Sequence, residues 1–224
     1  MTRPSYIGAG EFLPSERTLV DLAAAARDCR GCELYQDVDG TVFGEGPATA
    51  RLMLVGEQPG DVEDREGRPF VGPAGEVLAR ALADAGLSDT PYYVTNAVKH
   101  FRWKPAPRGK RRIHQTPSAA QSTACRPWLA AELAAVRPTV LVALGATASA
   151  SLLGPAFRLT QNRGVDIAWP PDRGSFAGDE TPVPHMLATV HPSAVLRAPD
   201  EDREQTRAGL VSDLRLAAEL LTGH

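Results

Sequence analysis

Short apolar runs alternate along the chain with longer segments in which apolar and polar positions repeat at helical spacing. Four runs are apolar over most of their length and are bounded by glycine, proline or polar residues, a pattern typical of buried strands. They are residues 51–55 (RLMLV), 92–98 (YYVTNAV), 139–144 (TVLVAL) and 185–190 (HMLATV). Because helical segments separate these runs, we expect parallel pairing and a sheet covered on both faces.

The segments between the runs carry helix start and stop signals, such as Gly86 after one amphipathic stretch and Pro138 after another. A further helix is expected just before Cys29, and residues 169–184 are expected to form a surface loop. The other predicted helices span residues 73–85, 116–136, 146–153 and 201–221. The pattern therefore predicts an α/β fold: one domain over residues 1–224, a three-layer α/β/α sandwich around a central four-stranded parallel sheet.

Composition narrows the class of protein. Hydrophobic residues make up 43% and charged residues 23% of the 224-residue chain, as in globular proteins. No run approaches the roughly 18 apolar residues of a membrane span, and the N-terminus lacks the basic start and apolar stretch of a signal peptide. The three cysteines are too few for a disulfide scaffold. We therefore expect a soluble, cytoplasmic protein, and we expect it to be a monomer.

Charge is distributed unevenly. Seven of the 24 Lys and Arg residues lie within residues 99–112 (KHFRWKPAPRGKRR), where there is no Asp or Glu. Phe101 and Trp103 are interleaved with these cations. Phosphates attract cations and bases stack on aromatic rings, so the segment favours a nucleic-acid partner. The alternative is a solvated loop that happens to be basic.

Polar residues follow the predicted strands. In open α/β sheets, functional groups gather beyond the carboxyl ends of the strands. The segments at these positions are 56–60 (GEQPG), 99–100 (KH), 145–147 (GAT) and 191–193 (HPS). We expect them to converge on one site. A phosphate-binding loop of the GxxxxGK[ST] type is absent from the sequence.

The cysteines form a candidate metal site. Cys29 and Cys32 make a Cys-x2-Cys pair, Cys125 lies far downstream, and His100 is available as a fourth ligand. These residue types do not by themselves distinguish a Cys3His zinc site from an iron–sulfur cluster. Cys125 taken alone is equally typical of a buried core cysteine.

Several motifs together resemble a known family. Residues 56–75 (GEQPGDVEDREGRPFVGPAG), 94–100 (VTNAVKH), 124–129 (ACRPWL) and 191–193 (HPS) resemble the iron–sulfur uracil-DNA glycosylases of family four type, in the expected order and over almost the whole chain. In that family four cysteines hold a [4Fe–4S] cluster. The resemblance implies the same cluster here, with Cys29, Cys32 and Cys125 as ligands and His100 in place of the remaining cysteine.

Three departures from the common family pattern resemble the UdgX branch: His100, Gln58, and the basic loop that ends in residues 110–114 (KRRIH). Members of that branch bind uracil-containing single-stranded DNA covalently through the loop histidine, which is His114 here. The resemblance also implies that Gln58 either contacts the base or braces the histidine loop. It further implies phosphate contacts from Lys110, Arg111, Arg112 and Arg197.

The resemblance assigns roles around the flipped base. Phe70 would stack on uracil, the amide of Asn96 would pair with O4 and N3–H, and His191 would donate a hydrogen bond toward O2, where negative charge develops. Our own hypothesis is that Glu57 orients His114, so that imidazole rather than water captures C1′ of the sugar.

The predicted function follows from these roles. We expect a protein that flips and excises uracil from DNA, single-stranded DNA by preference, and stays bonded to the abasic sugar through His114. Two alternatives stay open: an ordinary uracil-DNA glycosylase that turns over many times, and a lesion sensor that binds uracil-containing DNA without chemistry.

Overall fold

The fold is built on a four-stranded sheet. The computed structural model describes residues 5–109, 112–168 and 183–223. All neighbouring strands of the sheet are parallel, in the order β2-β1-β5-β6, and Gly56 at the end of β1 lies opposite Asn96 at the end of β2. The strands are β2 (Tyr92–Asn96), β1 (Leu52–Gly56), β5 (Val140–Leu144) and β6 (His185–Thr189).

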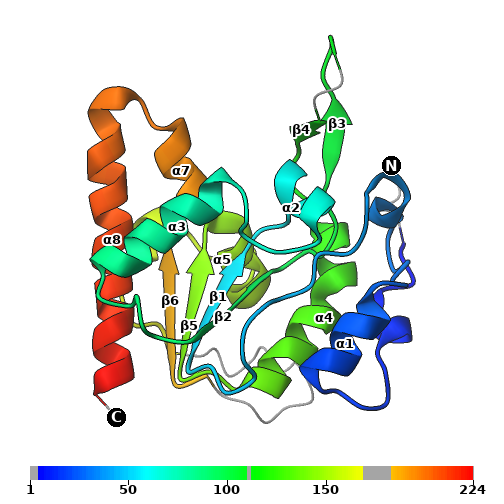
Figure 1. Cartoon of the computed structure of the whole chain (residues 1–224), viewed down its shortest axis with the longest axis horizontal. Helices are drawn as coiled ribbons and strands as arrows, with labels where there is room; N and C mark the ends of the chain where they lie inside the picture. Colours follow the sequence, from blue (N-terminus) through cyan, green and yellow to red (C-terminus); the bar gives the residue numbers. More distant parts are fainter. Residues whose placement is uncertain (1–4, 110–111, 169–182, 224) are drawn as a thin grey trace.

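Helices cover both faces of this sheet, which confirms the predicted three-layer α/β/α sandwich. Leu52 and Leu54 of β1 join the core under α3, α7 and α8, whereas Met53 and Val55 join the core under α4 and α5. Figure 1 shows α3, α7 and α8 on one side of the strands and α4 and α1 on the other. The helices are α1 (Leu19–Ala26), α3 (Pro73–Asp84), α4 (Ala119–Val136), α5 (Ala146–Leu153), α7 (Pro192–Arg197) and α8 (Asp200–Thr222).

The element bounds differ from the predicted ones by a few residues, for local reasons. The helix predicted from Thr116 begins at Ala119 because Ser118 caps it: Gln121 N–H donates to Ser118 Oγ at 3.2 Å, and Ser118 N–H donates to Gln121 Oε1 at 2.8 Å. The second strand ends at Asn96, although the N–H groups of Ala97 and Val98 still donate to the carbonyl oxygens of Gly56 and Glu57 at the end of β1.

Several structural elements were not predicted, among them a β-hairpin. The basic segment forms an antiparallel hairpin, in which Trp103 of β3 (Trp103–Pro105) lies opposite His114 of β4 (Arg112–His114). Figure 1 shows this β3–β4 hairpin projecting beyond the carboxyl ends of the parallel strands. Within the described residues, five short helices were likewise not predicted: η1 (Ala9–Phe12), η2 (Glu33–Asp37), α2 (Asp61–Glu66), α6 (Leu159–Asn162) and α7.

Two further sequence predictions concern a surface loop and membrane spans. Of the predicted surface loop 169–184, residues 169–182 lie outside the described residues. Across the described part of the chain, no helix is long and apolar enough to cross a membrane.

Candidate active site

Three of the four segments predicted to converge, 56–60, 145–147 and 191–193, meet at one edge of the sheet, whereas Lys99 and His100 of the fourth are buried beside Cys125 and Thr41. Glu57 follows β1, Asn96 ends β2, Thr147 lies in the first turn of α5 directly after β5, and His191 follows β6. Thr147 Oγ1 donates a hydrogen bond of 2.5 Å to Glu57 Oε2. A carboxylate, an amide and an imidazole are therefore gathered from separate chain segments.

Phe70 and Asn96 lie side by side because Gly56 leaves room for both. A Cβ atom on Gly56 would come within 2.4 Å of Asn96 Oδ1 and 2.6 Å of Phe70 Cζ. Phe70 also has a φ of +56°, a left-handed conformation that is rare for a bulky residue and occurs mostly at functional sites. Its ring centre lies 5.9 Å from that of His191, with 31° between the ring planes. A flat apolar face thus borders one amide and one imidazole.

The hydrogen bonds of His191 determine where its proton sits. His191 is the N-cap of α7, and Ser193 N–H donates to its Nδ1 at 3.2 Å. Nδ1 is therefore an acceptor, and the neutral ring carries its proton on Nε2. Burial, with smaller contributions from Arg197 and His114, lowers the pKa of His191 to about 4. At neutral pH this imidazole is uncharged and has one N–H to donate.

Arg197 is exposed and belongs to the same group. Its Nη1 donates to Ser193 Oγ at 2.8 Å, and that oxygen lies 2.7 Å from His191 Nδ1. The positive charge of Arg197 helps to lower the pKa values of both His191 and His114. Arg197 is therefore an exposed cation that lies near both histidines.

Glu57 and His114 face one another across the site. Glu57 Oε1 lies 3.5 Å from His114 Nε2, and within the described residues this buried oxygen accepts no hydrogen bond. Burial lowers the pKa of His114; Glu57 acts in the opposite direction and Arg197 in the same direction. The imidazole is thus neutral at pH 7 and keeps a nucleophilic lone pair. The carboxylate oxygen of Glu57 beside it can accept a hydrogen bond from the N–H group of the same ring.

Gln58 braces the hairpin that carries His114. Its Nε2 donates to the carbonyl oxygens of Arg102 and Gln115, both at 3.1 Å, and its Oε1 accepts from Arg102 N–H at 3.0 Å. The side chain is 6% exposed. Since these bonds occupy the amide, the structure favours bracing over base contact among the two roles predicted for Gln58.

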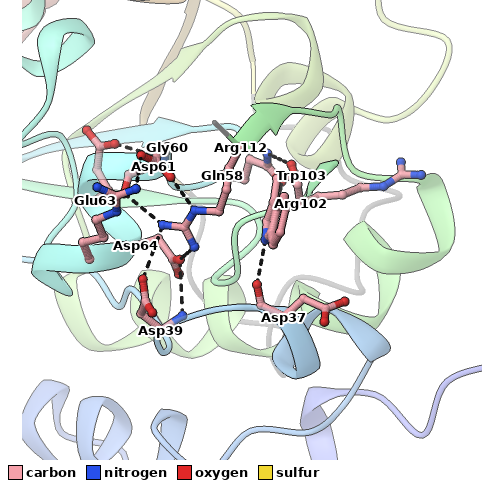
Figure 2. Close-up of polar contacts among 11 residues, drawn as sticks. Asp37, Asp39, Gln58, Gly60, Asp61, Glu63, Asp64, Arg102, Trp103 and Arg112 are labelled. Carbon is pink, nitrogen blue, oxygen red and sulfur yellow. Dashed lines mark hydrogen bonds and ion pairs between the residues drawn. The ribbon is translucent and has the colours of Figure 1, made fainter. Parts of the chain in front are cut away.

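Arg112 does not face solvent as a phosphate contact would. Its side chain is 12% exposed and forms ion pairs with Asp61, with Asp64 at 2.6 Å and with Asp39 at 3.3 Å. Figure 2 shows the guanidinium among these three carboxylates, which come from α2 and from the segment before β1. We call these four residues the Arg112 cluster. This placement disagrees with the predicted phosphate contact, because the guanidinium is already neutralised by acidic partners.

Other parts of the basic segment also differ from the predicted nucleic-acid surface. Phe101 is 2% exposed and Lys99 is fully buried. The rings of Phe101 and Trp103 lie 5.4 Å and 5.6 Å from the Arg112 guanidinium, so they stack on that cation. Lys110 and Arg111 lie outside the described residues.

The three cysteines lie in one buried cluster, and the sulfur atoms of two of them accept hydrogen bonds. Trp128 Nε1–H donates to Cys29 Sγ and Lys99 N–H donates to Cys125 Sγ, both at 3.2 Å. Burial raises the pKa of Cys32 to about 11 and that of Cys125 to about 12. A cationic group would be needed to hold these thiols as thiolates at neutral pH.

His100 lies 2.9 Å from Thr41 through Nε2. The single hydroxyl hydrogen of Thr41 is already donated to the carbonyl oxygen of Ala26 at 2.7 Å, so Nε2–H must be the donor and Nδ1 keeps its lone pair. Burial lowers the pKa of His100 to about 4, so the ring is a neutral ligand. Three thiols and this imidazole are the kinds of donor that iron–sulfur clusters use.

The predicted metal site is nevertheless not confirmed. Among the described residues, no group of three His, Cys, Asp or Glu side chains is placed to hold a single metal ion. A cluster of several irons needs a different arrangement from a single ion, because its ligands bind separate irons rather than one common centre.

Comparison with known proteins decides the family. The family model of the uracil DNA glycosylase superfamily matches residues 43–215, a range that includes Glu57, Phe70, Asn96, His114 and His191. The chain belongs to this superfamily.

Relatives within the superfamily align over most of their own length. A type-4 uracil-DNA glycosylase of Thermotoga maritima is 34% identical over 183 residues, covering 81% of this chain and 85% of the relative. One from Archaeoglobus fulgidus is 33% identical over 206 residues, covering 91% and 93%. One from Pyrobaculum aerophilum is 34% identical over 173 residues, covering 77% and 82%.

Sequence reasoning about this superfamily member missed several residues that shape the site. Thr147 and Ser193 lay inside segments predicted to converge, and their hydroxyl groups next to strand ends were a usable signal. The carboxylates of Asp61 and Asp64 lay inside the quoted motif of residues 56–75 without an assigned role. No local pattern indicated that they would pair with Arg112, 48 residues beyond Asp64.

Proposed function

We propose that the protein is a uracil-DNA glycosylase that, like members of the UdgX branch, becomes bonded to the abasic sugar through His114. The observation that carries the proposal is the pair of Glu57 Oε1 and His114 Nε2, 3.5 Å apart, with the carboxylate oxygen free of other partners in the described structure. Its relatives are named type-4 uracil-DNA glycosylases.

Base recognition rests on three side chains. The ring of Phe70 stacks on the flipped uracil. The amide of Asn96, 2% exposed, pairs with O4 and N3–H. A site built on such paired hydrogen bonds rejects cytosine, because cytosine presents the reverse pattern and would leave buried polar groups unsatisfied. The Nε2–H of His191 donates toward O2, where charge accumulates as the base leaves.

The proposed reaction breaks one bond to C1′ and forms another, and no water molecule takes part. The bond between N1 of uracil and C1′ breaks, and its electron pair leaves with the base as an anion. A ring nitrogen of neutral His114 donates its lone pair to C1′, which carries the positive charge of the oxocarbenium ion. The imidazolium that results is stabilised by the carboxylate of Glu57, which Thr147 holds in place.

DNA is held through its phosphates. Arg197, exposed and close to both histidines, contacts a phosphate beside the flipped nucleotide, with Lys110 and Arg111 as further contacts. Single-stranded DNA is preferred because the base then leaves no pairing partner behind.

A [4Fe–4S] cluster bound by Cys29, Cys32, Cys125 and His100 belongs to the same proposal. The donor set, the accepted N–H···S bonds and the lone pair on Nδ1 of His100 support it. When bound, the cluster would supply a structural link between the N-terminal segment, the end of β2 and α4, rather than acid–base groups.

A second candidate function is a glycosylase that turns over many times. The unpartnered Glu57 Oε1 favours it as well, since in the described structure this oxygen could activate a water molecule instead of orienting His114.

The deciding experiment is a denaturing gel. Protein is incubated with single- or double-stranded oligonucleotide that contains one uracil, and His114→Ser is run beside the wild type. We expect a shifted band that saturates at one adduct per chain, and we expect His114→Ser to give alkali-labile abasic DNA over repeated cycles. Abasic product without a shifted band would establish the second candidate, and neither product would leave only uracil-DNA binding.

A further inference from the structure

Lys99 and Glu132 form an ion pair in the interior of the protein. Both side chains are 0% exposed, and Lys99 Nζ lies 2.5 Å from Glu132 Oε2. Removing two charges from water costs several kcal/mol for each ion, and apolar replacements of such pairs are often at least as stable. Stability alone therefore does not explain this pair.

The hydrogen bonds of the pair are complete. Glu132 Oε1 accepts from Tyr93 Oη at 2.9 Å, from Thr95 Oγ1 at 2.8 Å and from Gly44 N–H at 3.2 Å. Besides Glu132, the Lys99 ammonium donates to Thr95 Oγ1 at 2.6 Å and to the carbonyl oxygen of Asn96 at 2.7 Å. All three ammonium hydrogens are thus used, and one of them holds the main chain of Asn96.

Asn96 is the residue whose amide borders Phe70. The chain directly after Asn96 is fixed to β1, because the N–H groups of Ala97 and Val98 donate to the carbonyl oxygens of Gly56 and Glu57. The carbonyl of Asn96 is taken up by Lys99. The peptide that carries the amide is therefore held between β1 and a buried cation.

The pair also joins this peptide to helix α4. Glu132 lies on α4 seven residues after Cys125, which is two helical turns along the same face. Lys99 N–H donates to Cys125 Sγ. One residue, Lys99, thus contacts both the helix and the strand end through separate atoms.

From this geometry we infer that Lys99 and Glu132 are positioning residues of the uracil site, which fix the Asn96 peptide so that its amide faces the base. The inference rests on the proposed function, in which Asn96 reads uracil. A displacement of about 1 Å in a reacting geometry can lower a rate about a hundredfold.

The test uses a charge-free double variant, Lys99→Met with Glu132→Gln. The glutamine amide keeps an acceptor for Tyr93 and Thr95, whereas the methionine thioether has no hydrogen to donate to Asn96. The matched control is Tyr93→Phe, which removes one bond to the same carboxylate and leaves Lys99 and Asn96 untouched. Uracil excision is followed with protein in excess over DNA, where the rate constant at saturation does not depend on the active fraction.

For the double variant we expect a rate constant at saturation about a hundredfold below that of wild type, and a half-saturating concentration within about threefold of it. Tyr93→Phe should lose thermal stability yet excise at the wild-type rate. A double variant that excises as fast as Tyr93→Phe would overturn the inference. If the wild-type protein does not excise uracil, the proposed function is contradicted instead.

Thr95→Val keeps the test decisive if the double variant does not fold. This nearly isosteric change removes one acceptor of the Lys99 ammonium and one donor to Glu132, but leaves both charges in place. We expect a rate constant about tenfold below wild type with DNA affinity unchanged. A wild-type rate constant for Thr95→Val would count against the inference in the same way.

Discussion

Replacing Arg112 by Met separates the role predicted from the sequence from the role shown by the structure. The substitution leaves Asp64, whose side chain is 0% exposed, without its cation. Removing one partner of a buried pair costs about 3–5 kcal/mol, and the partly exposed Asp61 and Asp39 place Arg112 at the low end, about 3 kcal/mol. For a chain of 224 residues, this corresponds to a fall of roughly 6–12 °C in the melting temperature.

Arg112→Met should also slow formation of the adduct at His114, without weakening the contacts between the protein and the DNA phosphates. The Arg112 cluster ties β4 to α2, so its loss loosens the hairpin that places His114 opposite Glu57. We expect adduct formation to slow by at least about tenfold. The salt dependence of DNA affinity should stay as in the wild type, whereas Arg197→Met should reduce its slope by about 0.7–0.9, the contribution of one phosphate contact.

Two measurements decide between the roles of Arg112. One is the melting temperature and the other is the slope of log affinity against log salt concentration. If Arg112→Met keeps the wild-type melting temperature and has a reduced salt slope, the stabilising role of the Arg112 cluster is refuted. Arg112 would then contact a DNA phosphate, as the sequence predicted. Adding Asp64→Asn to Arg112→Met removes the unpaired charge, so part of the lost stability should return.

Three further predictions concern the site and the metal. The wild-type rate of adduct formation should stay level as the pH falls to about 6.5, the ordinary pKa of histidine, because burial lowers the pKa of His114 and the ring stays neutral. In Glu57→Gln the rate should be lower. The fall of the rate at acid pH should also move to lower pH in this variant, since Glu57 raises the pKa of His114. An acid limb that moves to higher pH in Glu57→Gln would contradict this. Asn96→Asp should weaken the preference for uracil over cytosine at least about tenfold in excision assays, because the donor facing O4 becomes an acceptor; excision of uracil at the wild-type rate would exclude Asn96 as the selecting residue. The purified protein should be brown and contain iron, and Cys125→Ser should lose both colour and iron by metal analysis; one zinc per colourless chain would refute the cluster.

Local sequence patterns were enough to predict the sandwich and the edge at which the site forms. The strands around Leu54 and Val142 are buried on both faces, so they appear as continuous apolar runs. Capping residues such as Ser118 mark helix ends because they act within a single turn. The carboxyl ends of parallel strands share one edge, so identifying the strands was enough to place Glu57 and His191 at the same edge of the sheet.

Only the tertiary structure decided what the charged and amide side chains do. Lys99 and Arg112 belong to the same basic segment, yet one is paired with Glu132 and the other with three aspartates. Gln58 uses its amide to hold a hairpin whose three-residue strands are too short to produce a pattern. A sequence shows the sign of a charge or the presence of a donor, but the partner lies tens of residues away and is selected by packing. The free energy of burying a charge depends on that partner, so the role of each residue is determined only in the folded chain.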